Sequence, residues 1–495
     1  MNLDIVIMAA GKGTRMKSKL PKVLHTLAGR ALLHHVIDTA SQLLPRSMAT
    51  ITGHGAAQVI ASCAQYTWAG SRFKLNFVTQ EPQLGTGHAV QQAAPVLPDD
   101  GVTLILSGDV PLTQADTLQA LVQACGGTHL ALLTIDLSDP TGYGRIVRHG
   151  NQVQAIVEHK DASPAQRSIT EIYSGIMAAP TALLKKYLAL LDNSNAQKEF
   201  YLTDVVKHAV AAGTSVVAVK TTDAVQVAGV NSPVQLQELE REFQKRNAYR
   251  LMEQGVRIAD AARIDVRGSL SCGQDVSIDV NCVFEGTVVL ADGVKIGAHC
   301  CIANCSIATG AVVHPFTHID GGPAVDSKHD GEPTVDSKHD GGPTVDFKKH
   351  AEKLGVQIGA GALIGPFARL RPGAQLGDEV HIGNFVEVKN STLAKGAKAN
   401  HLAYLGDATV GERVNYGAGS ITANYDGANK HRTIIEADVH IGSNCVLVAP
   451  VTIGTGGTVG GGSTITKSTA AGALSVARGK QISIDNWARP AKKKT

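Results

Sequence analysis

Two regions of the chain arrange their hydrophobic residues in different ways. In residues 1–230, short apolar runs such as LDIVIMAA, VTLILSGDV and THLALLTIDL alternate with the amphipathic stretches KVLHTLAGRALLHHVIDTASQL and GHAVQQAAPVL. Short apolar runs predict buried strands, and apolar residues at helical spacing predict the helices between them. Because strands and helices alternate, we expect an α/β domain with a mostly parallel sheet, whose ligands bind at the carboxyl ends of the strands.

After about residue 265, aliphatic residues recur at every sixth position. The longest series are Ile358, Ile364, Leu370, Leu376, Ile382, Val388 and Ile435, Ile441, Leu447, Ile453, Val459, Ile465, and shorter ones run from Leu290 to Ile302 and from Ile307 to Ile319. Neither an α-helix nor an ordinary strand sustains a period of six, whereas the hexapeptide repeat of a parallel β-helix does. Cys300 and Cys445 fall on the same inward face, so we expect buried, unreactive thiols there.

One passage breaks the six-residue period. Residues 320–350 read DGGPAVDSKHDGEPTVDSKHDGGPTVDFKKH, a phrase that recurs every ten residues and carries Pro323, Pro333 and Pro343. Ten is not a multiple of six, and proline removes backbone donors that a coil needs, so we expect an exposed, disordered loop that leaves the β-helix. The alternative, a metal site built from its histidines and aspartates, is disfavoured because nothing fixes the ligands in geometry.

These patterns divide the chain into four parts. The prediction is an α/β domain over 1–231, a charged linking helix over 232–256, a β-helix over 257–485 interrupted at 320–350, and a basic tail over 486–495. A chain of 495 residues is also too long for one ordinary hydrophobic core.

Composition narrows the classes of function. The chain has 46 basic and 43 acidic residues, which argues against broad binding to nucleic acid or to a membrane surface. None of its 8 cysteines forms a C-x-x-C pair, so a zinc site is not expected. No apolar run approaches 18 residues and the N-terminus does not read as a signal peptide, so we expect a cytoplasmic protein.

A glycine-rich turn follows the first predicted strand. The segment MAAGKGTRMKSKLPK (8–22) fails the spacing of both the dinucleotide fingerprint and the Walker A loop. Backbone N–H groups in such a turn can still face phosphate oxygens, and Arg15 and Lys22 add positive charge.

This segment resembles the signature of nucleotide-sugar pyrophosphorylases. With QEPQLGTGHA (80–89), GDVPL (108–112), DPTGYGRIV (139–147), IVEHKDA (156–162) and YLTDVV (201–206), it resembles the uridyltransferase half of the bacterial bifunctional N-acetylglucosamine-1-phosphate uridyltransferase/glucosamine-1-phosphate acetyltransferase (GlmU) family. FARLRPGAQLGDEVHIGNFVEVKN and KANHLAYLGDATVGERVNYGAGSITANYDGANKHRT resemble the acetyltransferase half. The resemblance covers nearly the whole chain outside 320–350. It implies a Rossmann-like mixed sheet followed by a left-handed parallel β-helix.

For uridyl transfer the resemblance implies a nucleotide and phosphate site, a sugar site and a Mg²⁺ site. Asp109 and Asn231 would hold the Mg²⁺, which takes few protein ligands and keeps phosphate and water oxygens. The remaining residues implied are Met8, Ala9, Ala10, Gly11, Lys22, Gln80, Gly85 and Thr86 for UTP, and Gly108, Gly144 and Glu158 for the sugar.

Two residues depart from the family pattern. The chain reads EIYSG where the family usually has E-I-N-[ST]-G, which places Tyr173 in the sugar-nucleotide pocket. Ser107 replaces a tyrosine that is common before the GD pair. Our hypothesis is that uridyl transfer survives with altered substrate affinity.

For acetyl transfer the resemblance implies a histidine base. An uncharged amine must attack the thioester of acetyl-CoA, and a base of pKa near 7 suits that step. His401 is the candidate, because its position two residues after the inward Ala399 does not place it in the core. The resemblance further implies sugar-phosphate contacts from Arg371, Lys389, Tyr404 and Asn415, and acetyl-CoA contacts from Ala418, Asn424, Tyr425, Ser443, Gly461 and Arg478, with Gly461 standing where the family often has alanine.

The function expected is a bifunctional enzyme that converts glucosamine 1-phosphate into UDP-N-acetylglucosamine, a precursor of peptidoglycan and lipopolysaccharide. The family is trimeric, and each of its acetyl sites is built from more than one chain. Two alternatives stay open at this point. One is a different sugar-1-phosphate nucleotidyltransferase with a structural β-helix, and the other is a catalytically degraded subunit kept for assembly.

Overall fold

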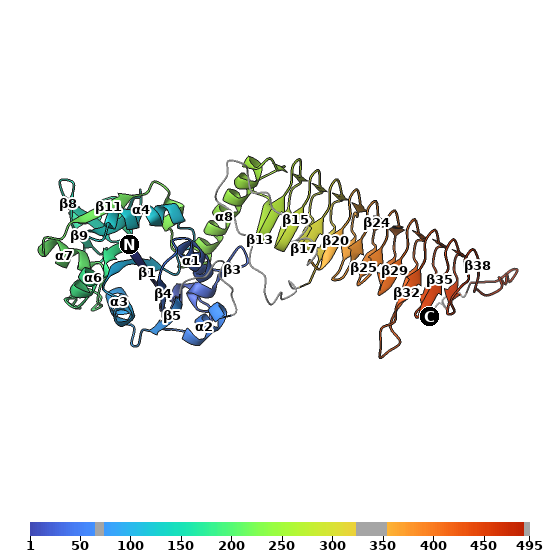
Figure 1. Cartoon of the computed structure of the whole chain (residues 1–495), viewed down its shortest axis with the longest axis horizontal. Coiled ribbons are helices and arrows are strands. Elements are labelled where there is room, and N and C mark those ends of the chain that lie inside the picture. The colour runs from blue at the N-terminus through green and yellow to red at the C-terminus, as the bar shows by residue number, and fades with distance from the viewer. Residues whose placement is uncertain (65–73, 323–353, 490–495) are drawn as a thin grey trace, which may run out of the picture. The chain divides into compact units, whose positions relative to one another are not determined.

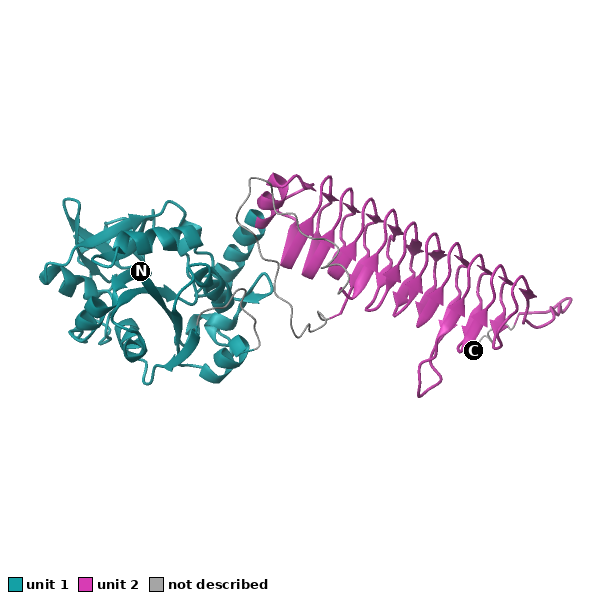
Figure 2. Ribbon diagram, in the orientation of Figure 1, with its two compact units in different colours: residues 1–246, 329–335 teal, residues 247–328, 336–495 magenta. Residues whose placement is uncertain are grey.

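The computed structural model describes residues 1–64, 74–322 and 354–489 (Figure 1). Within these residues the chain forms two compact units, 1–246 and 247–489, which Figure 2 colours separately. The repeated stretch from residue 323 onward and the last six residues of the tail lie outside the described residues.

The first unit is built on a mixed sheet. Its described strands lie in the order β11-β7-β10-β6-β1-β4-β5, with β8 and β9 attached beside β10. Their bounds are β1 Asn2–Ala9, β4 Ser47–Thr52, β5 Lys74–Thr79, β6 Gly101–Ser107, β7 Leu130–Asp136, β8 Arg145–His149, β9 Gln152–Val157, β10 Glu171–Pro180 and β11 Val216–Lys220. The strand β10 runs antiparallel to β6 and β7, whereas β1 is parallel to both β4 and β6. The predicted α/β domain is confirmed.

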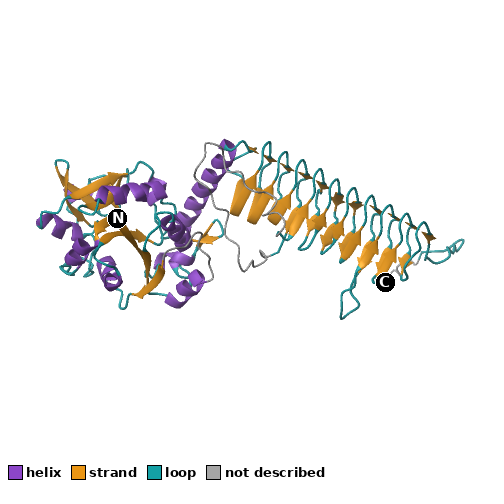
Figure 3. Cartoon of the chain, viewed as in Figure 1, coloured by secondary structure: helices purple, strands orange, loops and turns teal. Residues whose placement is uncertain are grey.

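Helices cover both faces of this sheet (Figure 3). They are α1 Leu32–Ser41, α2 Ala56–Ala64, α3 Thr86–Ala93, α4 Ala115–Cys125, α6 Thr181–Leu188 and α7 Asp204–Ala211, whereas α5 Pro164–Arg167 is a single turn without buried residues. Alternate residues of β1 divide between the two faces: Ile5 and Ile7 pack in one buried cluster, and Val6 packs in the other. A strand buried on both sides has no polar face, which explains why these strands read as continuous apolar runs.

One predicted helix is shorter than the sequence pattern indicated. The stretch KVLHTLAGRALLHHVIDTASQL begins with a 3₁₀ turn over Lys22–Leu24 and a two-stranded hairpin, β2 Thr26–Leu27 and β3 Arg30–Ala31, before α1 starts. Ala28 and Gly29 have φ angles of 52° and 78°, in the left-handed region that a tight hairpin turn requires. The expectation of one continuous helix here was wrong.

The segment expected to link the domains contains the helix α8, Pro233–Glu253. Its N-terminal part belongs to the first unit, where Leu239 packs with Leu27 and Leu32. Its C-terminal part belongs to the second unit, where Ala248 and Leu251 join the core of the β-helix. Gly255, with a φ of 96°, follows the end of the helix.

The second unit is a parallel β-helix of short stacked strands (Figure 3). One long stack follows the order β12-β14-β16-β18-β21-β24-β27-β30-β33-β36-β38. Its strands are β12 Arg257–Ile258, β14 Ser277–Ile278, β16 Lys295–Ile296, β18 Val312–Val313, β21 Leu363–Ile364, β24 His381–Asn384, β27 Lys398–His401, β30 Asn415–Tyr416, β33 His440–Ile441, β36 Thr458–Val459 and β38 Leu474–Ser475. The others are β13 Ile264–Cys272, β15 Cys282–Leu290, β17 Cys301–Ile307, β19 His318–Asp320, β20 Val356–Ile358, β22 Arg369–Leu370, β23 Gln375–Leu376, β25 Glu387–Lys389, β26 Thr392–Leu393, β28 Tyr404–Gly406, β29 Ala408–Val410, β31 Ile421–Ala423, β32 Thr433–Ile435, β34 Val446–Val448, β35 Val451–Ile453 and β37 Thr464–Ile465.

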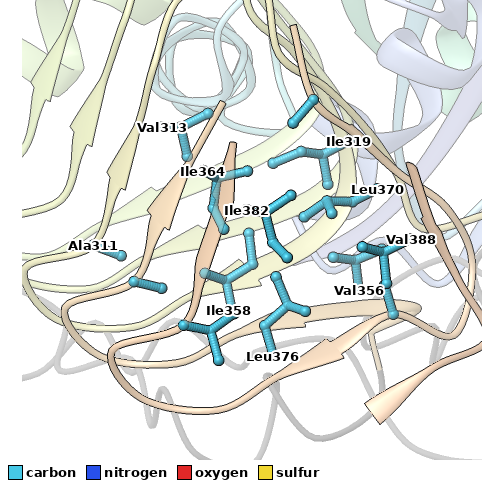
Figure 4. Packing of buried hydrophobic residues seen from close by; sticks show 14 of the residues in the cluster. Ala311, Val313, Ile319, Val356, Ile358, Ile364, Leu370, Leu376, Ile382 and Val388 are labelled. Atoms are coloured by element: carbon cyan, nitrogen blue, oxygen red, sulfur yellow. The ribbon is translucent and has the colours of Figure 1, made fainter. Parts of the chain in front are cut away.

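The aliphatic residues at six-residue spacing form the core of this unit, as predicted (Figure 4). Ile364 pairs with Ile382, and Leu370 pairs with Val388 on another stack, so three hexapeptides complete one coil. Cys300 and Cys445 are buried in the same core, and burial raises the pKa of the Cys300 thiol to about 12. Such a thiol stays protonated and unreactive at neutral pH.

The repeated stretch begins and ends at one corner of a coil. On β17, Ala303 pairs with Asp320 and Cys305 pairs with Val356, so the single residue Asn304 faces the point where the chain leaves and returns. The two ends lie in direct contact, because a Cβ atom on Gly355 would overlap the carbonyl oxygen of Gly321. The coil therefore closes independently of the residues in between.

None of the described helices has both the length and the apolar character that a membrane-spanning segment needs.

Candidate functional sites

A cavity of about 470 Å³ opens at the carboxyl ends of β1 and β6. Its walls include nine residues named from the sequence: Met8, Ala9, Ala10, Gly11, Lys22, Gln80, Gly85, Thr86 and Asp109. The position agrees with the rule that α/β sheets bind ligands beyond the carboxyl ends of their strands. Lys12, Gln83, Ser107 and Glu199 also line the cavity and were not singled out from the sequence as nucleotide contacts.

The glycine-rich turn leaves room for a ligand and for Lys22. A Cβ atom on Gly11 would meet no heavy atom within 4 Å, so this stretch of backbone is open to a ligand. Gly13 has a φ of 57°, and a Cβ there would lie 2.6 Å from the Cβ of Lys22. Glycine at 13 thus lets the turn fold back over Lys22. Arg15 is exposed and does not line the cavity, in contrast to the role expected for it.

At the edge of this cavity, one side-chain oxygen of Asp109 and one of Asn231 both lie next to the ammonium group of Lys22. The ammonium group of Lys22 pairs with Oδ2 of Asp109 and donates to Oδ1 of Asn231 at 3.3 Å. The backbone N–H of Val230 donates to the carbonyl of Asp109 at 2.9 Å, which holds the Asn231 segment beside the end of β6. A carboxylate oxygen and an amide oxygen that lie close enough to share one cation could also bind Mg²⁺, which takes a few hard oxygen ligands from a protein. Among the described residues no three His, Cys, Asp or Glu side chains cluster as a metal site, so a metal here would also need ligand or water oxygens.

Gln80, Gly85 and Thr86 form a second wall. The Gln80 side chain donates to the Gly85 carbonyl at 2.9 Å, and the Thr86 hydroxyl accepts from the N–H of Leu202 at 3.1 Å. Gly85 has a φ of 114°, and a Cβ there would lie 2.6 Å from the carbonyl oxygen of Phe200. Only glycine fits this close approach of two backbone segments.

A second cavity, of about 210 Å³, shares Met8, Thr86 and Ser107 with the first. Gly144 and Glu158, named from the sequence for the sugar, line it. Burial raises the pKa of the Glu158 carboxyl, which accepts a hydrogen bond from the Thr203 hydroxyl at 3.1 Å. Gly108 lines neither cavity, and its N–H donates to the Met8 carbonyl at 2.9 Å.

Tyr173 and Ser107, the two departures from the family pattern, line this same second cavity. Tyr173 is only 7% exposed, and its hydroxyl has no hydrogen-bond partner among the described residues. Burial, with a smaller effect of Glu158, raises the pKa of its phenol. Both departures therefore lie at the second cavity, and Ser107 also lines the first.

In the second unit, Arg371, Lys389 and Tyr404 lie on consecutive coils. Glu387 pairs in register with Tyr404, and Lys389 pairs with Gly406. The Arg371 guanidinium donates to Glu387 at 2.7 Å. A Cβ on Gly406 would overlap the phenol of Tyr404, so glycine there gives the ring its place. The neighbouring Lys430 ammonium lowers the pKa of Lys389, Arg371 adds a smaller lowering and Asp407 opposes it, so several positive charges gather here.

His401 lies at the exposed end of β27. Its Nδ1 donates to Oδ1 of Asn384 at 2.9 Å, which leaves Nε2 with a lone pair. Leu402 follows with a φ of 48° and turns the chain toward Tyr404. The exposed His401 can therefore accept a proton at Nε2. It lies three residues before Tyr404, which the sequence predicts to contact the sugar phosphate.

Four of the residues named for acetyl-CoA continue the row of His401. Lys398 pairs with Asn415, Asn415 with His440 and His440 with Thr458. Continued along the strands, this register places His401, Ala418, Ser443 and Gly461 above one another. Arg478 closes the row, since its guanidinium donates to the Gly461 carbonyl at 2.8 Å.

The remaining three residues lie apart from this row. Asn415 begins β30, three residues before Ala418. Asn424 and Tyr425 lie in the loop between β31 and β32, where Asn424 donates to Asp407 and the Tyr425 hydroxyl donates to the Gly427 carbonyl at 2.6 Å. Within one chain the predicted acetyl site is therefore divided between the row of His401 and the loop that follows β31.

Comparison with known proteins defines the class. Residues 5–194 match the family model of the MobA-like NTP transferase domain, and residues 355–390 match six repeats of the bacterial transferase hexapeptide. The chain thus joins a nucleotidyltransferase domain to a hexapeptide-repeat transferase domain.

Full-length relatives give the family. The bifunctional protein GlmU of Albidiferax ferrireducens is 69% identical, over 99% of this chain and 100% of the relative. That of Polaromonas naphthalenivorans is 70% identical, over 99% of this chain and 98% of the relative. That of Janthinobacterium sp. (strain Marseille) is 53% identical, over 99% of each. The chain belongs to the family of bifunctional GlmU proteins, and it is an enzyme with uridyltransferase and acetyltransferase activities. The family, fold class and pair of activities predicted from the sequence motifs are confirmed.

Proposed function

We propose that the second unit acetylates glucosamine 1-phosphate with acetyl-CoA and that the first unit then joins N-acetylglucosamine 1-phosphate to UTP, releasing pyrophosphate. The observation that carries this proposal is the cavity at the ends of β1 and β6, where nine residues named from the sequence meet around Lys22 and Asp109. UTP and the sugar phosphate are both polyanions, so a site that joins them must neutralise their repulsion.

In the first unit, the open backbone around Gly11 and the Lys22 ammonium would bind the phosphates of UTP. The adjoining cavity, with Gly144, Glu158 and Tyr173, would hold the sugar. A phosphate oxygen of the sugar phosphate then attacks the α-phosphorus of UTP in line with the departing pyrophosphate. The chain supplies positioning and positive charge, without a covalent intermediate.

Asp109 and Asn231 would hold Mg²⁺, because their oxygens already converge on a cation. The metal would supply positive charge to the phosphate oxygens of the two substrates. Lys22 would then move from the carboxylate to the phosphates, where its charge is needed.

In the second unit, Arg371, Lys389 and Tyr404 would bind the sugar phosphate, since the gathered positive charges of Arg371, Lys389 and Lys430 suit a phosphate group. The amine attacks the thioester carbonyl as Nε2 of His401 accepts its proton. A C–N bond forms, the C–S bond breaks, and coenzyme A leaves as a thiolate that takes up a proton. The row of Ala418, Ser443, Gly461 and Arg478 would hold the cofactor.

We further propose a homotrimer, with acetyl sites completed by neighbouring copies. Phe316, Phe367 and Phe385 are 49%, 46% and 56% exposed and stack on consecutive coils, with ring centroids 5.0 and 5.3 Å apart. Leu402, beside His401, extends this edge and is 62% exposed. An exposed apolar edge next to a catalytic residue supports burial against another copy. UTP and acetyl-CoA are cytoplasmic metabolites, so the proposal places the reaction in the cytoplasm.

Metal removal tests the assignment of chemistry to the two units. With EDTA, formation of UDP-N-acetylglucosamine from UTP and N-acetylglucosamine 1-phosphate should fall to background, and added Mg²⁺ should restore it. Acetylation of glucosamine 1-phosphate by the same sample should continue, since its proposed base is His401. Uridyl transfer at full rate in EDTA would contradict the Asp109–Asn231 metal site.

A further inference from the structure

Asn384 and His401 form a matched pair on neighbouring coils. Asn384 ends β24, His401 ends β27, and the two residues are partners in the strand register. The histidine Nδ1 donates to the Asn384 side-chain oxygen at 2.9 Å, and the N–H of Leu402 donates to the Asn384 backbone oxygen at 3.1 Å. Asn384 therefore holds both the ring and the chain that follows it.

The backbone fixes the position of this pair. The backbones of the two coils lie in close contact one residue earlier, where a Cβ on Gly383 would overlap the carbonyl oxygen of Asn400. Asn384 is half-buried, and the corner after it is made by Phe385 with a φ of 57°. Rigid strands, rather than a loop, thus bring the amide oxygen to the imidazole.

The chemistry of an amide oxygen selects one tautomer of the ring. A carbonyl oxygen only accepts hydrogen bonds, so the nitrogen that faces it must carry hydrogen. A neutral imidazole carries one hydrogen, so Nε2 keeps its lone pair. The amide is uncharged and orients the ring without the strong stabilisation of imidazolium that a carboxylate would give.

From this geometry we infer that Asn384 is a positioning residue for acetyl transfer: its side-chain oxygen holds His401 with hydrogen on Nδ1, so that Nε2 accepts the proton of the attacking amine. This inference rests on the role proposed for His401. Asn384 itself need not touch either substrate.

The surroundings allow an electrostatic test. The strand β27 lies between β24 and β30. On these three strands the other ionisable side chains are His381 and Lys398, which begin β24 and β27, and the buried Tyr416, which pairs with Ala399 two residues before His401. A carboxylate introduced at 384 would thus be the nearest charge on these strands to the His401 ring.

The experiment compares purified full-length variants in the acetyl assay. Asn384→Ala should lower kcat about 10-fold or more, short of the roughly 100- to 10,000-fold that a general base contributes, while KM for both substrates stays within about twofold. Asn384→Asp should raise the pKa of His401 and move the acidic limb of the kcat/KM profile to higher pH by about one unit. Asn281→Asp is the matched control, because Asn281 contacts His299 on earlier coils at 3.4 Å, and it should change neither quantity.

Three outcomes would overturn the inference. They are an unchanged kcat in Asn384→Ala, an unmoved acidic limb in Asn384→Asp, or a loss in Asn384→Ala that appears as raised KM together with a lowered melting temperature. His401→Ala in the same assays separates this failure from that of the proposed function. If His401→Ala is inactive and Asn384→Ala is normal, only the inference fails. If His401→Ala is fully active, the proposed base fails and the inference fails with it.

Discussion

At the scale of single residues, Tyr173 is the side chain whose environment poses the clearest question. A buried hydroxyl without a partner costs about 1–3 kcal/mol, and the Tyr173 hydroxyl is in that position beside the second cavity. A sugar ligand that offers it a hydrogen bond would recover part of that cost. Tyr173 would then contribute to substrate affinity while destabilising the free protein.

Tyr173→Phe should therefore raise the melting temperature and also raise KM for N-acetylglucosamine 1-phosphate by about 2- to 10-fold, the equivalent of one hydrogen bond. Thermal denaturation and steady-state uridyl transfer measure the two effects. Tyr416→Phe is the control, because the Tyr416 hydroxyl in the β-helix is also buried and has no partner in the part of the chain that the structure describes. It should raise stability and leave this KM unchanged. A lowered melting temperature in Tyr173→Phe would show that the hydroxyl is already satisfied.

The pair proposed to bind metal, Asp109 and Asn231, shows what the sequence could and could not predict at this scale. The resemblance to the family, carried in part by the GDVPL motif, identified Asp109 as a candidate metal ligand. Its approach to Lys22 and Asn231 depends on the hydrogen bond from Val230 to Asp109, which no local pattern encodes. The Asn384–His401 pair was missed, although a signal existed: the two residues are 17 positions apart, close to one coil of the β-helix.

At the scale of elements, the hexapeptide coils tolerate little change where their backbones meet. Gly383→Ala should destabilise the β-helix by about 1–3 kcal/mol or more, because the new methyl group overlaps the Asn400 carbonyl. Gly461→Ala is the matched substitution, since its Cβ would lie 3.4 Å from the Ser443 carbonyl, and it should leave stability nearly unchanged. Urea denaturation followed by circular dichroism distinguishes them. Equal stability of the two variants would mean that the coils shift apart easily.

The spacing of apolar residues predicted the β-helix correctly but predicted one helix of the first unit too long. The six-residue spacing predicted the buried positions of the β-helix because every coil repeats the same geometry, as the pairing of Ile364 with Ile382 shows. The helix expected over residues 22–43 was predicted too long, because the helical spacing of apolar residues continues through the hairpin of Thr26–Ala31. The Ala28-Gly29 pair in its turn was the local signal that could have corrected it.

At the scale of the whole molecule, the repeated stretch is an insertion at one corner of a coil. Asn304 is the only residue of β17 that faces the gap, and Gly321 already touches Gly355. Deleting 322–354 would join Gly321 to Gly355, so it should restore a regular coil and leave both activities within about twofold, because closing a long loop costs little. The two half-reactions and the mass of the assembly measure this. Loss of either activity, or of the proposed trimer, would contradict the account.

The central claim is that two independent sites share one chain, and a paired substitution tests it most directly. Asp109→Ala and His401→Ala are assayed beside the parent protein for both half-reactions. Asp109→Ala should abolish uridyl transfer and keep acetyl transfer near the parent rate, since its loss removes a ligand in one cavity only. His401→Ala should do the reverse. Loss of both activities from either substitution, in protein that folds normally, would contradict the account.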